Sequence, residues 1–259
     1  MRHFAPPRFS LRAIAVWRRN FLVWKKLAIP SMLGNLADPM IYMFGLGYGL
    51  GAMLPAVNGL PYIAFLAGGT LCASTMNAAT FEALYSAFSR MHVQKTWEAL
   101  LYAPLDLDDV VAGEWLWAAS KSMLSGTAIL GVIALLGFVH SPMALWVLPV
   151  IFLTGLAFAG LGLIINALAP SYDFFMYYFT LVITPMIFLS GVFFPLDQLP
   201  ELARWVACVL PLSHAVALVR PLLTGEIPAQ ALTHVMVLAG IAITSFWIAL
   251  SLTRRRLLG

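Results

Sequence analysis

Charged residues are scarce in this 259-residue chain. Asp, Glu, Lys and Arg together make up 10% of it and hydrophobic residues make up 61%, whereas soluble domains average about 25% and roughly 45–50%. Apolar runs of about 20 residues, each long enough to cross roughly 30 Å of hydrocarbon, recur along nearly the whole length. The composition excludes an ordinary soluble domain and predicts an all-α polytopic membrane protein.

Cysteine is almost absent, since the chain has only Cys72 and Cys208. Cys72 falls inside a predicted span and Cys208 in a predicted outer segment, so the two thiols lie at different depths and no disulfide is expected. A signal peptide is not expected either, because the first long apolar run begins only near Ile29, contains Asp38 and lacks a small-residue cleavage site. We expect the first span itself to direct insertion.

Motifs for catalysis, metal binding and nucleotide binding are also lacking. The five histidines are scattered without an HExxH pattern or a paired acidic motif, so no catalytic residue and no metal site is expected. There is no G-x-x-x-x-G-K-S/T phosphate loop, so this chain is not expected to bind ATP. Two alternatives of other classes are a membrane-embedded transferase and an ion-coupled transporter with Asp38 or Glu82 as charge carrier. The latter class often has repeated halves, and no convincing repeat is evident here.

Six membrane spans are predicted, at residues 29–51, 61–80, 112–139, 144–168, 174–194 and 231–252. Lys and Arg accumulate in cytoplasmic segments, and here they cluster before the first span, after the second and at the C-terminus. These basic residues are Arg2, Arg8, Arg12, Arg18, Arg19, Lys25, Lys26, Arg90, Lys95, Arg254, Arg255 and Arg256, and the opposite side has only Arg204 and Arg220. Both termini are therefore predicted to be cytoplasmic. The net charge of +4 reflects this asymmetry, and no nucleic-acid partner is expected.

The arm before the first span, residues 1–28, has an amphipathic pattern. Apolar residues recur at spacings of three and four, and Arg12, Arg19 and Lys26 recur at seven on another face, as in a basic amphipathic helix. Such a helix lies along a membrane surface, because its aromatic rings enter the headgroup boundary and its cations attract anionic lipid. A simple topology signal is the alternative. The apolar positions are Leu11, Ile14, Trp17, Phe21, Trp24 and Ala28.

Asp38 lies inside the first predicted span, about 14 Å deep at about 1.5 Å per residue. A carboxylate at this depth usually faces a partner or water, so Asp38 is a candidate substrate or proton site; a buried structural contact or a kink beside Pro39 is the alternative. In the third span, Lys121 follows Glu114 by seven residues on the same face and is expected to extend towards the cytoplasm. The first span ends in closely spaced glycines that allow helices to approach, namely Gly45, Gly47, Gly49 and Gly51.

The predicted cytoplasmic loop, residues 81–111, contains a second short helix. Thr96 is expected to cap it and Glu98 falls in its first turn, while Leu101 gives it an apolar face and Pro104 ends it. A short amphipathic helix on such a loop suits the docking of another protein. The alternative is loop filler that shields the entry to the third span.

The fifth span breaks at Ser190-Gly191 and is followed by a segment, residues 195–229, that is too apolar for a solvated loop. Irregular backbone at membrane depth survives only where protein buries it or where it lines a watery cavity. We expect Arg220 in this segment to bind a helix-end carbonyl, and an anionic headgroup is the alternative. Aromatic residues nearby suit either a glycolipid route or membrane anchoring; they include Tyr172, Phe174, Phe175, Tyr177, Tyr178, Phe193 and Phe194.

Two stretches resemble the membrane subunit of type-2 ABC exporters. They are KTWEALLYAPL after the second span and LSGVFFPLDQLPELARWVACVLPLSHAVALVRPLLTG after the fifth. The arm and first span, VWRRNFLVWKK and GNLADPMIYMFGLGYGLG, are similar to a narrower branch, the nodulation protein J type of lipo-oligosaccharide export permease. The likeness covers nearly all of the chain in order.

The resemblance implies a permease of the bacterial inner membrane that exports a lipo-oligosaccharide or a related amphipathic glycolipid; efflux of hydrophobic drugs is the alternative within the superfamily. ATP and Mg would be bound by a separate phosphate-loop ATPase subunit similar to nodulation protein I. Two copies of the permease would pair with the first and fifth spans near the dimer axis, and the segment 195–229 would be a re-entrant helical hairpin on the outer face.

The same resemblance assigns roles to particular residues. Coupling to the ATPase would fall to Thr96, Trp97, Glu98, Leu101, Pro104, Arg12, Arg19 and Lys26. The outer gate would consist of Ser190, Gly191, Pro195, Pro200, Pro211 and Arg220, and dimer packing would involve Gly45, Gly47, Gly49 and Gly51. The candidate substrate route comprises Asp38, Tyr177, Tyr178, Phe193 and Phe194.

Overall fold

The computed structural model describes residues 5–8, 10–54, 56–57 and 59–258. Arg2, counted above among the basic residues of the arm, lies outside the described residues. The described chain is helical, and it contains no β-strand beyond one isolated bridge between Val57 and Leu60. The all-α prediction is confirmed.

Each predicted span coincides with a helix, and the fifth coincides with the continuous run α7–η4–α8. The α-helices are α1 Ala13–Lys25, α2 Ala28–Gly49, α3 Tyr62–Phe81, α4 Thr96–Leu101, α5 Leu107–Leu135, α6 Val147–Leu168, α7 Asp173–Tyr178, α8 Thr184–Leu189, α9 Glu201–Ala207, α10 Pro211–Thr224 and α11 Ala231–Leu258. The 3-10 helices are η3 Pro142–Trp146 and η5 Leu196–Gln198, and the π-helical turns are η1 Glu82–Ser86, η2 Ser89–Val93 and η4 Phe179–Ile183.

The helices differ in how well they suit a membrane. Three of the described helical segments, Leu107–Leu135, Pro142–Leu168 and Ala231–Leu258, are long and apolar enough to cross one, and α9 with α10 would make a fourth as a single unit bent by 83°. The run α7–η4–α8 is shorter. Helices α2 and α3, with 22 and 20 residues, are not among these segments.

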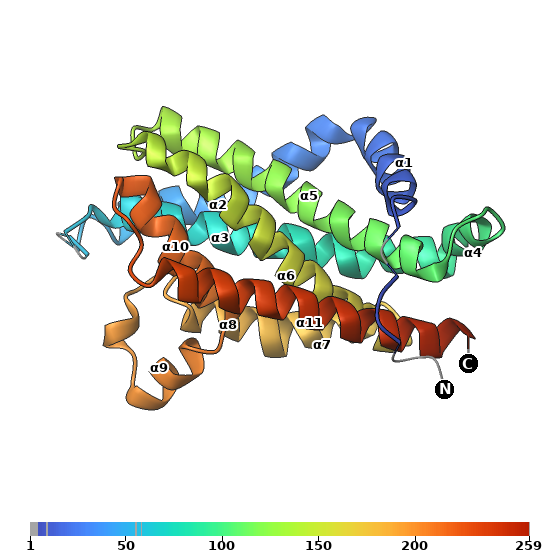
Figure 1. Cartoon of the computed structure of the whole chain (residues 1–259). Coiled ribbons are helices and arrows are strands. Elements are labelled where there is room, and N and C mark those ends of the chain that lie inside the picture. The colour runs from blue at the N-terminus through green and yellow to red at the C-terminus, as the bar shows by residue number, and fades with distance from the viewer. Residues whose placement is uncertain (1–4, 9, 55, 58, 259) are drawn as a thin grey trace.

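Small residues allow the central helices to pack closely. Helix α6 lies against both α5 and α11 (Figure 1). A Cβ atom added at Gly155 would lie 2.1 Å from the Ser122 hydroxyl of α5, and one at Gly160 would lie 2.1 Å from the Ser245 hydroxyl of α11. Helix association in lipid depends on such close backbone approach, because lipid supplies no hydrophobic driving force between helices.

The π-helical turns continue α3 beyond the predicted span. In a regular α-helix, eight residues turn through two full turns plus about 80°, which would point Glu82 and Arg90 in different directions. The wider i→i+5 turns of η1 and η2 reduce this offset, and Arg90 Nη2 donates to Glu82 Oε1 at 2.8 Å. The side-chain amide of Asn166 on α6 donates to the Ala83 carbonyl of η1 at 2.9 Å, which satisfies an acceptor at this irregular turn.

Helix α4 and the C-terminal part of α11 lie at one end of the bundle, and α9 and α10 lie at the opposite end (Figure 1). The basic C-terminal part of α11 is packed against the protein. Arg254 pairs with Asp108 at the start of α5 and donates to the Ala5 carbonyl at 2.6 Å. Arg256 Nη1 donates at 3.0 Å to the carbonyls of Asn166 and Ala167, which are orphan acceptors at the end of α6.

Local signals at helix ends were predicted with mixed success. Asp106 caps α5 in a capping box with Asp109, so the helix begins five residues before the predicted span. Thr96 as the cap of α4 is wrong: Lys95 occupies that position in a left-handed conformation, with φ 54°, and there is no side-chain cap. Pro200 immediately precedes α9, and Pro211 is the first residue of α10.

Candidate functional site

Helix α4 is anchored by one residue and exposes others. Trp97 is only 2% exposed and its indole Nε1 donates to Glu114 Oε1 of α5 at 3.1 Å. Glu98 points outward and pairs with Lys95 at 2.7 Å, with more than half of both side chains exposed. Leu101 is partly buried against the core. The helix therefore has the fixed inner face and accessible outer face that a docking element requires.

The amphipathic helix α1 contacts the same region. Arg12 Nη1 donates to the Pro104 carbonyl at 2.9 Å, and Arg19 Nη2 lies 3.5 Å from the Thr96 hydroxyl. Burial lowers the pKa of the Arg19 guanidinium, and the nearby charge of Arg90 lowers this pKa further. The charge of Glu114 raises it, but by less. The Lys26 side chain is exposed, with no hydrogen bond or ion pair among the described residues. Of the predicted coupling residues, all but Lys26 thus gather around α4.

Four charged residues form a buried network beneath α4, which we call the charge network: Glu82, Arg90, Glu114 and Lys121. Arg90 bridges the two acids, with Nε donating to Glu114 Oε1 at 2.9 Å and Nη2 to Glu82 Oε1 at 2.8 Å. Lys121 Nζ donates to Glu82 Oε2 at 2.6 Å. The acids are 3% and 2% exposed. Lys121, which was expected to extend towards the cytoplasm, has Glu82 as an ion-pair partner within the bundle.

Aromatic residues connect α1 to the charge network. Trp17, Phe21 and Trp24 of α1 surround Trp117 of α5 with ring centroids 5.9–6.5 Å apart, and Trp117 Nε1 donates to Glu82 at 2.8 Å. Part of the predicted apolar stripe therefore packs on protein instead of lipid, whereas its first members remain exposed. Those exposed members are Leu11 and Ile14.

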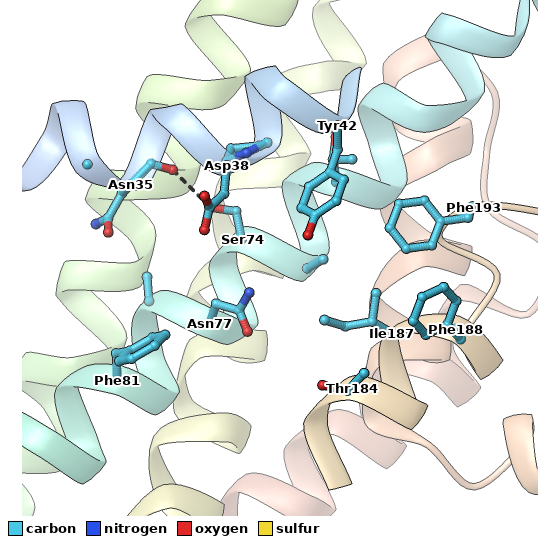
Figure 2. A pocket seen from close by; sticks show the side chains of 15 residues that line it. Asn35, Asp38, Tyr42, Ser74, Asn77, Phe81, Thr184, Ile187, Phe188 and Phe193 are labelled. Atoms are coloured by element: carbon cyan, nitrogen blue, oxygen red, sulfur yellow. Dashed lines mark hydrogen bonds between the residues drawn. The ribbon is translucent and has the colours of Figure 1, made fainter. Parts of the chain in front are cut away.

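A second candidate site is a cavity of about 220 Å³ bounded by α2, α3, α8 and the stretch after Gly191 (Figure 2). Asp38 lines it from α2, Asn77 from α3 and Phe193 from the far side. The Asp38 carboxylate makes no hydrogen bond or ion pair with the described part of the protein. The structure thus brings a mid-span acid, an amide and an aromatic ring to one opening.

Only part of the predicted substrate route meets at this cavity. Asp38 and Phe193 line it, and Tyr42, which the sequence analysis did not single out, lies with its ring 5.7 Å from that of Phe193. Tyr177 is exposed and Tyr178 is buried, and neither lines the cavity. Phe194 does not line it either.

The predicted outer gate forms a tight turn held by one cation. Gly191 adopts φ 74°, a conformation that favours glycine. Arg220 of α10 donates to the Gly191 carbonyl at 2.8 Å, and its guanidinium lies 3.6 Å from the ring centroid of Phe65. The expected carbonyl partner of Arg220 is therefore present. Ser190 is fully buried, and Pro195 precedes η5.

The glycines of α2 do not all serve one contact. A Cβ at Gly47 would lie 2.9 Å from Ile63, so this position packs on α3 within the same chain. A Cβ atom added at Gly45 or Gly49 would have no described atom within 4 Å, and Gly51 lies beyond the end of α2. Of the four glycines predicted to pack at a dimer contact, Gly45 and Gly49 are thus free for a contact with another molecule.

The described cysteines are both free thiols, Cys72 buried and Cys208 exposed. The described residues contain no group of three or more His, Cys, Asp or Glu side chains arranged to hold a metal ion.

Comparison with known proteins identifies the family of this chain. Nodulation protein J of Rhizobium leguminosarum bv. viciae is 53% identical over 252 residues, covering 97% of both chains. Nodulation protein J of Rhizobium meliloti (strain 1021) is 51% identical, covering 95% of this chain and 94% of its own. The inner membrane transport permease YadH of Escherichia coli (strain K12) is 22% identical over 78% of this chain and 79% of its own. Residues 12–224 match the ABC-2 type transporter family, and the chain belongs to this family as an ABC exporter permease.

Proposed function

We propose that this permease exports a lipo-oligosaccharide or a related amphipathic glycolipid outward across the bacterial inner membrane, driven by a separate phosphate-loop ATPase similar to nodulation protein I. The observation that carries the coupling proposal is the convergence of α1 and α4 on the charge network. An ATPase that moves the exposed face of α4 would move Trp97, and Trp97 is bonded to Glu114. The displacement would thereby reach α5 and the π-helical end of α3.

The proposed topology has six spans, with both termini and α4 cytoplasmic and the α9–α10 hairpin dipping into the membrane from the outer face. The basic residues support this orientation, because they gather at the α4 end of the bundle. The 83° bend between two short apolar helices supports a re-entrant hairpin. Hydrogen bonds from side chains inside the bundle hold the irregular turns, as in the bond from the Arg220 guanidinium to the Gly191 carbonyl.

The proposed assembly contains two permeases and two ATPase subunits. Exposed apolar side chains on α2 and on the α7–α8 run, including Ile41, Phe44 and Leu181, support a contact between copies there, and Gly45 and Gly49 leave room for close approach. ATP and Mg would be bound by the ATPase subunits.

The contacts of Glu82 argue against one of the two carriers considered for the rival ion-coupled function. A carrier must exchange its ion, yet Glu82 accepts hydrogen bonds from Arg90, Lys121 and Trp117 at once. These contacts support a structural and coupling role for this acid.

The test is to co-purify the chain with its candidate ATPase and to replace Glu98 and Leu101 together by alanine. We expect the E98A/L101A permease to insert and to assemble, while glycolipid-stimulated ATP hydrolysis falls about tenfold, a coupling loss within the usual range. The matched control is E201A/L202A on α9, an acid and a leucine exposed at the opposite end, which should retain assembly and stimulation. Normal stimulation in the E98A/L101A complex would refute the coupling role, and failure of the native chain to bind any such ATPase would refute the proposed function.

A further inference from the structure

The cavity between α2, α3 and α8 has a one-sided charge. Among the described residues that line it, Asp38 is the only ionisable acid or base apart from the Tyr42 phenol, and none is Lys, Arg or His. A carboxylate within a membrane segment is costly unless a partner or water faces it. A ligand that carries its own negative charge would be repelled at this site, because no cation is present to compensate.

The cavity also presents hydrogen-bond acceptors without partners. The side-chain oxygen Oδ1 of Asn77 is buried and has no hydrogen-bond partner, and the more exposed Asp38 carboxylate has none within the described chain. Two of the hydroxyls that line it donate to backbone carbonyls: Ser74 to Asn35 at 3.4 Å and Thr70 to Leu66 at 2.8 Å. An unpaired buried acceptor costs free energy, so the site favours a ligand that supplies hydroxyl or N–H groups.

Aromatic rings border this polar surface. Phe193 lies 5.5 Å from Phe188 and 5.7 Å from Tyr42, measured between ring centroids. Figure 2 shows Phe188 and Phe193 across the opening from Asn77 and Asp38, with the Tyr42 ring between Asp38 and Phe193. A flat molecule with apolar faces and a polar edge satisfies both surfaces. A volume of about 220 Å³ is below the roughly 300–1,000 Å³ of sites for drug-sized ligands, so the cavity holds one unit of a larger substrate.

We propose that this cavity binds a single neutral or cationic glycosyl unit of the exported molecule and selects against anionic headgroups. Asp38 and Asn77 accept hydrogen bonds from the hydroxyl or N–H groups at the edge of the sugar, and the rings of Tyr42, Phe188 and Phe193 cover its apolar face. This inference rests on the proposed function, because it assumes that the exported molecule carries a sugar. It adds the site, the polarity of the headgroup and the residue that selects it.

The test uses two photoreactive alkyl glycosides that share one diazirine-bearing octyl chain, a glucoside and a glucuronide. They differ by one carboxylate. The full-length permease in phosphatidylcholine nanodiscs is labelled with each, and the cross-linked peptides are identified by mass spectrometry. We expect the glucoside to label residues 34–42, 70–81 and 184–193. The glucuronide should need on the order of 10- to 100-fold higher concentration for the same labelling, because repulsion replaces a hydrogen bond to a charged group.

Two substitutions separate recognition from a structural effect. Asp38→Asn should bring the two probes to within about threefold of each other, and Asp38→Lys should reverse the preference; neither is expected of a residue that only maintains the fold. Asp173→Asn, the same change at an exposed acid outside the cavity, should leave the preference unchanged. Equal labelling by both probes in the native chain, or an unchanged preference in D38N, would overturn the inference.

The labelling requires no ATPase, so its outcome is independent of the proposed function. If the permease binds no ATPase but labels as described, only the exporter assignment fails. If the complex exports glycolipid but the preference for the glucoside is absent, only the cavity assignment fails.

Discussion

Replacing Arg90 by methionine should destabilise the permease strongly, because Arg90 is the common partner of two buried acids. In the native protein it donates to Glu114 through both Nε and Nη2 and to Glu82 through Nη2. Without Arg90, Glu82 keeps Lys121 at 2.6 Å and Trp117 at 2.8 Å. Glu114 keeps only the Trp97 indole, so most of the cost falls on this acid.

The expected magnitude follows from that unpaired charge. Removing one partner of a buried ion pair costs about 3–5 kcal/mol, whereas replacing both partners by neutral groups is often nearly neutral. The double variant R90M/E114Q retains the Glu82–Lys121 pair and an amide oxygen for Trp97. We therefore expect it to be within about 1–2 kcal/mol of the native protein and more stable than R90M alone.

The assay is reversible unfolding of the purified permease in mixed micelles with increasing dodecyl sulfate, followed by tryptophan fluorescence and circular dichroism. The control is K95M, which removes the exposed Lys95–Glu98 pair and should cost less than about 1 kcal/mol. If the losses of unfolding free energy in the single variants R90M and E114Q add up to the loss in the double variant, Arg90 and Glu114 are not energetically coupled and the reasoning fails.

Two further substitutions test the coupling helix and the tight turn. Trp97→Phe keeps most of the packing of α4 but removes the donor to Glu114, so we expect a loss of about 1.5–3 kcal/mol in unfolding free energy. ATPase stimulation should be weaker while assembly is intact, which co-purification and hydrolysis rates measure. Stimulation equal to native would contradict the role of this bond. Gly191→Ala places a residue with a side chain at φ 74°, with its Cβ 3.1 Å from Leu196. We therefore expect the unfolding free energy to fall by about 1–2 kcal/mol in the same micelle titration. An unfolding free energy equal to native would show that the turn relaxes to accommodate the side chain.

The sequence predicted those features that depend on near neighbours along the chain. Helix α1, helix α4 and the turn at Gly191 each follow from periodicity, a proline or a glycine within a few residues. The cap of α5 also depends on near neighbours, since Asp106 and Asp109 are three residues apart. The exception is Thr96, where the left-handed conformation of Lys95 replaced the expected cap.

The charge network could not be predicted in this way. Arg90 and Glu114 are 24 residues apart, and Glu82 and Lys121 are 39 apart, so their pairing depends on how α3 and α5 pack. The π-helical turns add a second obstacle, because regular helical spacing places Glu82 and Arg90 on different faces. Local reasoning assigned Lys121 to the membrane boundary for lack of a visible partner.

By itself, the sequence determined that this protein is a helical membrane permease with a basic amphipathic arm, a short loop helix and a broken fifth span. Hydrophobicity, charge and turn residues act over a few residues or over a whole segment, so the linear order of the chain displays them. Only the tertiary structure decided that Asp38, Asn77 and Phe193 share one cavity and that Trp97 reaches Arg90 through Glu114. Those groups come from different helices, and only the packing of the helices brings them within hydrogen-bonding or contact distance.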